Sequence, residues 1–415
     1  MAHSILGLSI LILTLLATSA PSAEPLKSTW PQWRGPNRDG TVGYSDWVED
    51  LSERHLVELW SVKLGPSYSG PIVAADHVFL TETKDKKYEV VYALDRETGK
   101  QLWKAEWEGA IQVPFFAAAN GSWIRATPAY DGERLFVAGM RDVLVCIRAA
   151  TGEILWKRDF VAETGSKLPD FGFVSSPLVS GDHVFVQAGG GIAKLDKFTG
   201  KTIWTTLQDG GGMFGSAFSS PVLTTIAGVE QLVVQTRSKL AGVDIKDGTL
   251  LWSQDIEAFR GMNILTPTVV GNSVFTSSYG GRSTMFNISK SREQWSVTET
   301  WNHKSQGYMS SPVVIEGHIY LHLRNQRFVC LDVKSGEECW TSTPFGKYWS
   351  MIVSGNNILA LDQCGELLLM KASPEEFKLI SRRQVAEDCW AHLAVAGDQV
   401  FVRDLQAIKV FKWNK

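Results

Sequence analysis

Apolar residues in this chain come in short runs, either continuous or alternating with polar residues, and Gly, Pro, Asp and Asn separate the runs. One series of runs recurs: two small residues and a proline, an apolar strand, a second apolar strand, and then Leu-Asp-x-x-Thr-Gly-x-x-x-Trp. It is clearest from Ser69 to Trp103 and from Ser175 to Trp204. Asp and Thr bond to nearby backbone and Gly takes the positive φ of a tight turn, so Asp-x-x-Thr-Gly predicts a hairpin.

A repeat with a period of about 40–50 residues predicts stacked supersecondary units, and four-stranded blades are the natural unit. Leu56–Trp60 has the pattern of a last strand with no strands before it, whereas the end of the chain lacks a last strand. We therefore predict an all-β fold: an eight-bladed β-propeller of four-stranded antiparallel blades, closed by an N-terminal strand that joins the C-terminal blade. Seven blades are the alternative, because the last two copies have lost the Pro and the Trp. The eight copies begin near Pro71, Pro128, Pro177, Pro221, Pro267, Pro312, Met351 and Ala391.

Seven of the 16 tryptophans fall on what should be the outermost strand of a blade. There an indole ring packs between neighbouring blades while its N–H finds an acceptor at the rim. We predict this blade-docking role for Trp60, Trp103, Trp156, Trp204, Trp252, Trp295 and Trp340.

The first residues have the composition of an export signal. Ile5–Leu16 is apolar and small residues follow it up to Ala23. At about a dozen residues this stretch is too short to span a bilayer and is typical of a signal peptide. We predict a signal peptide at residues 1–23, an N-terminal arm at 24–55 that wraps the propeller, and the propeller at 56–415, with a retained anchor helix as the alternative. The expected location is therefore periplasmic or secreted, without a stable membrane anchor.

Five cysteines are an odd number for an oxidising compartment. Cys330 and Cys339 flank one predicted hairpin turn, and Cys364 and Cys389 should reach the same face of the propeller. Each pair is either a disulfide or two unconnected thiols.

Charge excludes some partners. A formal net charge of −3 and an isoelectric point near 6.3 leave no basic stripe, so nucleic acid and anionic membranes are not expected partners, and we expect a monomer. No His-x-His or His-Glu-x-x-His spacing predicts a metal site.

The loops that lead into the inner strands are rich in aromatic residues. These loops should share one face, and a concave aromatic lining with a few polar groups is the usual pattern of a binding site. The alternative is that the rings plug the channel and pack against each other. The predicted channel-mouth residues are Trp123, Arg125, Phe173, Phe218, Asn263, His303, Tyr308, Trp349, Trp390 and His392.

The repeats, together with Trp30-Pro-Gln-Trp-Arg-Gly-Pro-Asn-Arg-Asp-Gly40, resemble the pyrroloquinoline quinone (PQQ)-like β-propeller repeat family, in its secreted branch, from about Trp30 to Trp413. The resemblance implies the fold but not one function, because the family includes quinoprotein alcohol dehydrogenases and the assembly protein BamB. Trp30 and Trp33 are expected to cover blade edges.

Members with dehydrogenase activity carry PQQ and Ca²⁺ at the channel mouth. Ca²⁺ needs converging oxygen ligands that include carboxylates, but the segments that enter the inner strands contain no acid. The sequence therefore favours an exported, non-catalytic platform for a protein or small ligand. A PQQ-dependent oxidoreductase with PQQ and Ca²⁺ is the alternative, and a glycan-binding module is the third hypothesis.

Overall fold

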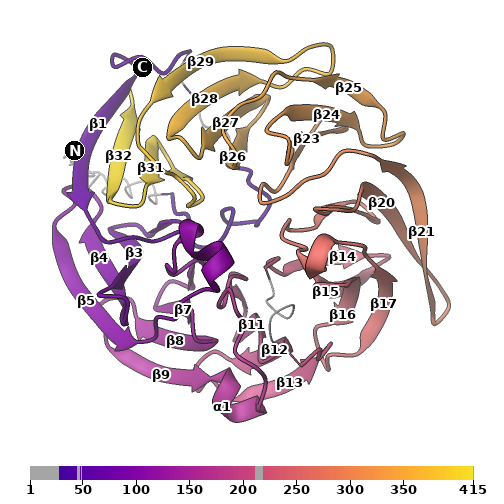
Figure 1. The fold of residues 1–415 in the computed structure, drawn as a ribbon, viewed down its shortest axis with the longest axis horizontal. Coiled ribbons are helices and arrows are strands. Elements are labelled where there is room, and N and C mark those ends of the chain that lie inside the picture. The colour runs from indigo at the N-terminus through magenta and orange to yellow at the C-terminus, as the bar shows by residue number, and fades with distance from the viewer. Residues whose placement is uncertain (1–27, 44–46, 48, 211–217, 415) are drawn as a thin grey trace, which may run out of the picture.

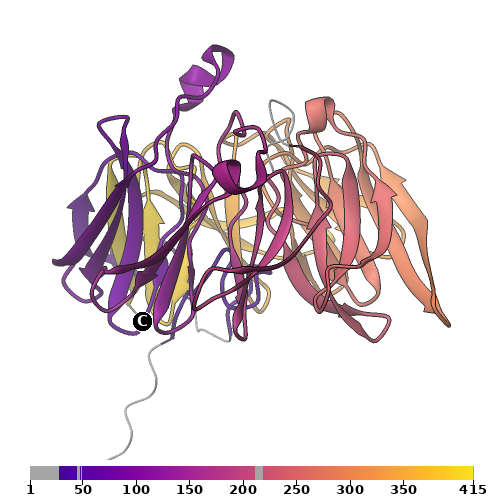
Figure 2. The same cartoon turned by 90° about the horizontal axis from the view of Figure 1, so that it is seen from below.

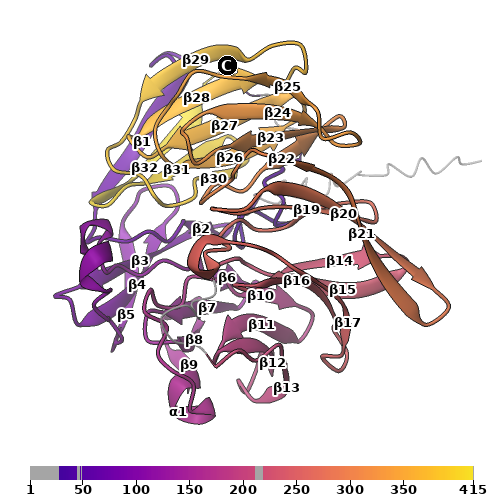
Figure 3. The ribbon, with the colours of Figure 1, turned by 45° about the vertical axis from the view of Figure 1, so that its right-hand side comes forward.

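The computed structural model describes residues 28–43, 47, 49–210 and 218–414. Eight four-stranded antiparallel sheets surround a central channel like the blades of a fan (Figure 1), which confirms the predicted eight-bladed propeller. Turned to one side, the ring shows its sheets side by side, each nearly on edge (Figure 3). Residues 1–23, the predicted signal peptide, lie outside the described residues. Within the described part, no helix is long and apolar enough to cross a membrane.

In each blade the strands follow one another from the channel to the rim. Blade 1 consists of β2 (Ile72–Val73), β3 (His77–Lys84), β4 (Tyr88–Asp95) and β5 (Gln101–Glu108). Blade 2 consists of β6 (Ala129–Tyr130), β7 (Arg134–Gly139), β8 (Val143–Arg148) and β9 (Ile154–Asp159). Blade 3 consists of β10 (Leu178–Ser180), β11 (His183–Ala188), β12 (Gly191–Asp196) and β13 (Thr202–Thr206). Blade 4 consists of β14 (Val222–Ile226), β15 (Val229–Gln235), β16 (Lys239–Asp244) and β17 (Leu250–Asp255).

Blade 5 consists of β18 (Thr268–Val270), β19 (Ser273–Ser277), β20 (Ser283–Ser291) and β21 (Gln294–His303). Blade 6 consists of β22 (Val313–Ile315), β23 (His318–His322), β24 (Phe328–Asp332) and β25 (Glu338–Thr341). Blade 7 consists of β26 (Trp349–Ser354), β27 (Asn357–Asp362), β28 (Glu366–Lys371) and β29 (Lys378–Gln384). Blade 8 combines β30 (Ala394–Ala396), β31 (Gln399–Arg403) and β32 (Ala407–Trp413) with β1 (Leu56–Lys63). The short helices are η1 (Phe115–Asn120), α1 (Phe160–Thr164) and η2 (Phe259–Gly261).

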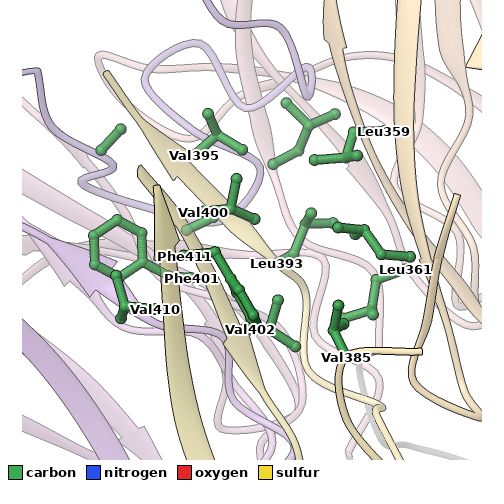
Figure 4. Packing of buried hydrophobic residues seen from close by; sticks show 14 of the residues in the cluster. Leu359, Leu361, Val385, Leu393, Val395, Val400, Phe401, Val402, Val410 and Phe411 are labelled. Atoms are coloured by element: carbon green, nitrogen blue, oxygen red, sulfur yellow. The ribbon is translucent and has the colours of Figure 1, made fainter. Parts of the chain in front are cut away.

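Closure of the ring depends on strands from opposite ends of the chain. β1 pairs antiparallel with β32, from Leu56 opposite Trp413 to Lys63 opposite Ala407, so the predicted N-terminal strand completes blade 8. Between blades 7 and 8, buried side chains of β27 and β31 such as Leu359 and Val400 interleave (Figure 4). The pairing joins the two ends of the chain, and β1 covers the edge that β32 would otherwise expose.

The Thr-Gly of the repeat has two separate roles, as the β12–β13 turn shows. Asp196 Oδ1 accepts hydrogen bonds from the Thr199 backbone N–H and hydroxyl, each at 2.7 Å. Gly200 has φ 70° and lies under the Trp156 ring of the preceding blade, where a Cβ atom would come within 2.8 Å of Trp156 Cδ2. The turn therefore needs glycine both for its backbone angle and for the close approach of the indole.

Five of the seven predicted docking tryptophans, Trp60, Trp103, Trp156, Trp204 and Trp340, donate their indole N–H to a backbone carbonyl of the next blade. Trp252 packs between blades as predicted but with a different hydrogen-bond acceptor, and the prediction is wrong for Trp295. Trp252 packs against blade 5 but donates to Gln231 of its own blade, and Trp301 replaces Trp295 by donating to the Val333 carbonyl. The β20–β21 hairpin lacks the Asp-x-x-Thr-Gly turn and has longer strands, so the docking register falls six residues after Trp295.

A ring of hydroxyl groups joins the inner ends of the blades, where the inner strands have no neighbour in their own sheet. The backbone N–H of Gly70 donates to Thr127 Oγ1 at 3.0 Å, that of Thr127 to Ser176 Oγ at 3.0 Å, and that of Ser176 to the Ser220 hydroxyl at 2.9 Å. Ser310, Ser311 and Ser350 accept equivalent bonds from neighbouring blades. We call these six residues the hydroxyl ring: Thr127, Ser176, Ser220, Ser310, Ser311 and Ser350. Small residues precede the prolines because the blades converge there, and several of these residues carry a hydroxyl that accepts a backbone N–H of a neighbouring blade.

All five cysteines, which lie within the described residues, are free thiols in this structure. Cys330 is buried and lies opposite Trp340 in the β24–β25 pairing, and its thiol is within hydrogen-bond reach of the exposed Cys339. Cys364 is likewise exposed on its turn, whereas Cys389 is buried.

The hydroxyl ring makes a stability prediction with a matched control. Replacing Ser176 by alanine leaves the buried Thr127 N–H without an acceptor, so we expect Ser176→Ala to lower the free energy of unfolding by about 1–3 kcal/mol. The neighbouring Ser175 is fully buried and its hydroxyl has no hydrogen-bond partner, so Ser175→Ala should be neutral or stabilising. Urea unfolding of both variants measures the difference, and equal losses would contradict a role for the hydroxyl ring.

Candidate functional site

The loops that join each outer strand to the next inner strand lie on one face of the ring, which we call the loop face. Short helical turns project from it, on the upper side of Figure 2. The longest of these loops, between β5 and β6, contains η1. Phe115 and Phe116 of η1 expose 91% and 52% of their surface, which is unusual for side chains of this size.

The N-terminal arm crosses the channel. Trp30 forms an antiparallel bridge with Val73 of blade 1, and Thr41 forms a parallel bridge with Val353 of blade 7. Between them, Trp33 donates its indole N–H to the Thr266 hydroxyl of blade 5 at 3.2 Å. Figure 1 shows this indigo segment in the middle of the ring. Trp30 thus covers the inner edge of blade 1, as expected, whereas Trp33 packs against His392 and bonds to Thr266 within the channel.

Two buried arginines fasten the arm to the blades. Arg38 donates to the Pro177 and Ser176 carbonyls of blade 3 at 2.8 and 3.1 Å, and Arg34 donates to the Pro312 carbonyl of blade 6. Burial lowers the pKa of Arg34 to about 10 and that of Arg38 to about 9, so both remain charged at neutral pH. Their N–H groups satisfy carbonyl oxygens on the inner edges of the blades, which no sheet partner reaches.

A cavity of about 170 Å³ opens above the arm at the channel mouth, and we call it the cup. Its aromatic lining consists of Trp33, Tyr68, Phe171, Phe218, Tyr308 and Trp390. The rest of the lining is aliphatic or polar: Ala117, Asn120, Arg125, Val174, Ser176, Ser220, Met262, Ile264 and Met309. Trp33 brings the arm into the lining, and the other residues come from loops that are distant in sequence. The cup is thus a largely apolar site with one charged side chain.

Tyr and Trp rings follow one another around one side of the cup, one from each of five blades. Consecutive ring centroids lie 4.8, 4.4, 6.0 and 5.3 Å apart. All five rings are half-buried: Tyr68, Trp390, Tyr348, Tyr308 and Tyr279. We call them the aromatic arc. Its two ends are next to arginines, since the Arg125 guanidinium lies 5.5 Å from the Tyr68 ring and that of Arg324 lies 4.1 Å from Tyr279. On the other side of the cup, Phe116, Phe171 and Phe218 form an apolar row.

Four of the ten predicted mouth residues line the cup, namely Arg125, Phe218, Tyr308 and Trp390. Trp123 lies beside them, half-buried against Gly121 after η1. His303 lies apart, in a groove of about 530 Å³ between blades 5 and 6 that also contains Lys304, Arg324 and Arg327.

The other four predicted residues serve the fold. Phe173 is 2% exposed in the core between blades 2 and 3, and Trp349 is buried against the His322 ring at 4.7 Å. Asn263 donates to the Thr236 and Arg237 carbonyls at 3.1 and 2.9 Å. His392 packs edge-on against Trp33, and burial lowers its pKa to about 3, so it is neutral at physiological pH. Phe173 and Asn263 do not line the cup, whereas Trp349 and His392 line a smaller cavity of about 50 Å³ that shares Trp33, Met309 and Trp390 with it.

Several cup residues escaped the sequence prediction. Trp33 belongs to a motif outside the repeats, and only the threading of the arm brings it under the mouth. Phe171 occupies a loop position where the repeats carry unrelated residues, so no shared spacing marks it. Tyr68 had an available signal, because Tyr68, Tyr308 and Tyr348 all stand one or two places before a serine near the start of an inner strand.

The cup does not fit a PQQ–Ca²⁺ centre. Ca²⁺ takes 6–8 oxygen ligands, usually with carboxylates among them, but none of the 15 lining residues is Asp or Glu. Asp388, the acid next to the aromatic arc, is exposed and accepts the Trp390 indole N–H at 3.0 Å. Across the described residues, no three His, Cys, Asp or Glu side chains converge as metal ligands. The site therefore offers stacking, apolar contact and one guanidinium.

Comparisons with known proteins found a matching family model and relatives of low sequence identity. The family model described as outer membrane protein assembly factor BamB matches residues 86–342. BamB of Moranella endobia (strain PCIT) is 22% identical over 365 residues, covering 83% of this chain and 87% of that protein. A polyvinylalcohol dehydrogenase of Sphingopyxis sp. (strain 113P3) is 28% identical over 211 residues, but these cover 46% of this chain and 31% of that protein.

Among solved structures, BamB from Moraxella catarrhalis superimposes with a TM-score of 0.65 at 16% identity, covering 86% of this chain and 100% of that one. At this identity the likeness concerns the fold alone.

The arm that carries Trp33 into the cup yields a second stability prediction. In Arg38→Met the buried carbonyls of Ser176 and Pro177 lose their donor, so we expect the free energy of unfolding to fall by about 2–4 kcal/mol. Asn37→Ala, an exposed change one residue away, should cost less than about 0.5 kcal/mol. Urea unfolding measures both variants. Equal stability of Arg38→Met and the unmodified protein would show that the arm does not fasten the blades.

Proposed function

Because this chain belongs to the family of outer membrane protein assembly factor BamB, we propose that it is an exported, non-catalytic platform whose loop face binds a partner protein. The chemistry of the cup carries this proposal: its lining is aromatic and apolar, and it provides no carboxylate for a metal, a proton transfer or a nucleophilic attack. Family membership supports a location at the periplasmic side of the outer membrane, and the apolar stretch Ile5–Leu16 supports export.

The loop face has the features of a protein-binding surface. Large exposed aromatic side chains provide contact area at low entropic cost and are enriched where binding energy is concentrated. Phe115 and Phe116 pack against each other at 5.7 Å on η1, beside the cup, and Phe116 continues into the apolar row through Phe171. A partner that covers η1 and the aromatic arc would bury apolar surface and satisfy the polar edges of the Tyr and Trp rings.

The alternative function, a PQQ-dependent oxidoreductase, has a direct test. We expect Ca²⁺ not to increase the amount of PQQ that the purified protein retains after dialysis, because the cup has no carboxylate ligands for the ion. Absorbance of the dialysed protein and quenching of tryptophan fluorescence measure retention. A stoichiometric complex that requires Ca²⁺ would overturn the platform proposal and direct the search to alcohols and sugars.

Partner binding is tested by photo-crosslinking in the source cells. A benzophenone side chain in place of Phe115 should form an adduct with one outer-membrane protein or assembly component, because Phe115 is the most exposed aromatic residue of the described loop face. The same group in place of Ile380, exposed at 42% on the outer strand of blade 7, is the control. Phe116→Ser should reduce the Phe115 adduct. Equal adducts from both positions would exclude the loop face as the specific surface.

A further inference from the structure

Arg125 is a half-buried cation in the cup lining, without an acidic partner among the described residues. Its Nη2 group donates to the Gly121 carbonyl at 2.7 Å, and its buried Nε–H has no acceptor. No described Asp or Glu forms an ion pair with it, and the undescribed segment 211–217 has no acid in its sequence. Burial lowers the pKa of Arg125 to about 10, so it is charged at neutral pH.

The fully buried arginines of this chain have more partners than Arg125, although the Nε–H groups of Arg34, Arg38 and Arg403 also lack an acceptor. Arg96 donates to Gln399 and to three backbone carbonyls, and Arg403 donates to three carbonyls. Arg38, on the arm, reaches two carbonyls and Gln32. A guanidinium has five N–H donors, and Arg125 uses one of them within the described protein. Arg125 thus has spare donors, and it lines the cup.

The surroundings of Arg125 favour one kind of ligand. A cavity of about 170 Å³ is roughly ten times the space that one water molecule needs. Phe171, Phe218, Trp390 and the Trp33 ring of the arm offer flat apolar surfaces. Beside such apolar surfaces a carboxylate forms paired, charge-assisted hydrogen bonds with a guanidinium, whereas a second cation is repelled and a neutral polar group makes weaker bonds.

We propose that the cup binds a small aromatic carboxylate, whose ring packs among Phe218, Trp390 and Trp33 and whose carboxylate pairs with Arg125. The proposal rests on the cup being a binding site, as in the proposed function, but it concerns a ligand inside the cup and not the partner on the loop face. The same chemistry occurs in a free metabolite and at the C-terminus of a peptide that ends in an aromatic residue.

The test compares two probes that differ in charge alone, 3-phenylpropionate and 3-phenylpropionamide, by isothermal titration. We expect the acid to bind at least tenfold more tightly than the amide. Arg125→Gln should weaken acid binding by about tenfold to a hundredfold and leave amide binding unchanged, as expected for loss of charge-assisted hydrogen bonds. Arg382→Gln, on the outer strand of blade 7, is the matched control and should change neither affinity.

Two further binding measurements complete the experiment. Phe218→Ala should weaken acid and amide alike, because it removes apolar contact and not charge. A five-residue peptide ending in Phe, as the free acid and as the amide, separates the two sources: a peptide acid that binds more tightly than 3-phenylpropionate points to a partner's C-terminus. Equal affinity of acid and amide in both pairs, or no loss with Arg125→Gln in a protein that retains its circular dichroism spectrum, overturns the proposal. Retention of PQQ with Ca²⁺ would instead contradict the proposed function.

Discussion

The inner edges of the blades impose the constraint on which this propeller depends. In every blade the inner strand has a partner on one side and faces the channel on the other, where converging blades leave little room for water. Its backbone N–H and C=O groups there still need partners. The N–H groups donate to hydroxyls of neighbouring blades, such as Ser176 and Ser220. Several carbonyls accept from the arm through Arg34 and Arg38. The hydroxyls thus provide acceptors for the N–H groups, and the arginines of the arm provide donors for the carbonyls.

Because hydroxyls accept from the N–H groups and arm arginines donate to the carbonyls, features of the sequence that look unrelated have a common explanation. Small residues precede the prolines of the repeats, and those with hydroxyls, such as Ser176, Ser220 and Ser311, accept backbone N–H groups of neighbouring blades. The arm motif has two arginines four residues apart, and they reach blades on different sides of the channel, blade 6 for Arg34 and blade 3 for Arg38. The same arm positions Trp33 under the cup. The same segment therefore stabilises the centre of the ring and lines the cup, so a change in the arm affects both.

The sequence predicted the fold because each repeat encodes its own local geometry. Asp196 and Gly200 determine a turn within a few residues, and Trp156 then has a defined position on the next blade. Ring closure was also predictable, since Leu56–Trp60 had no other strands to join. The prediction failed where the repeat changed: the β20–β21 hairpin lost its turn motif, and Trp301 took the docking position that spacing had given to Trp295.

The cup was harder to predict, because it is formed where seven loops and the arm converge and the repeat no longer specifies side-chain direction. Phe171 and Phe173 are two residues apart, yet Phe171 lines the cup and Phe173 lies in the core. Asn263 has a polar side chain at the mouth, but two backbone carbonyls occupy its amide group. Arg125 is in the opposite situation, with donors left over. What separates a structural polar residue from a binding one here is the number of partners the protein itself provides, and that number depends on packing between distant loops.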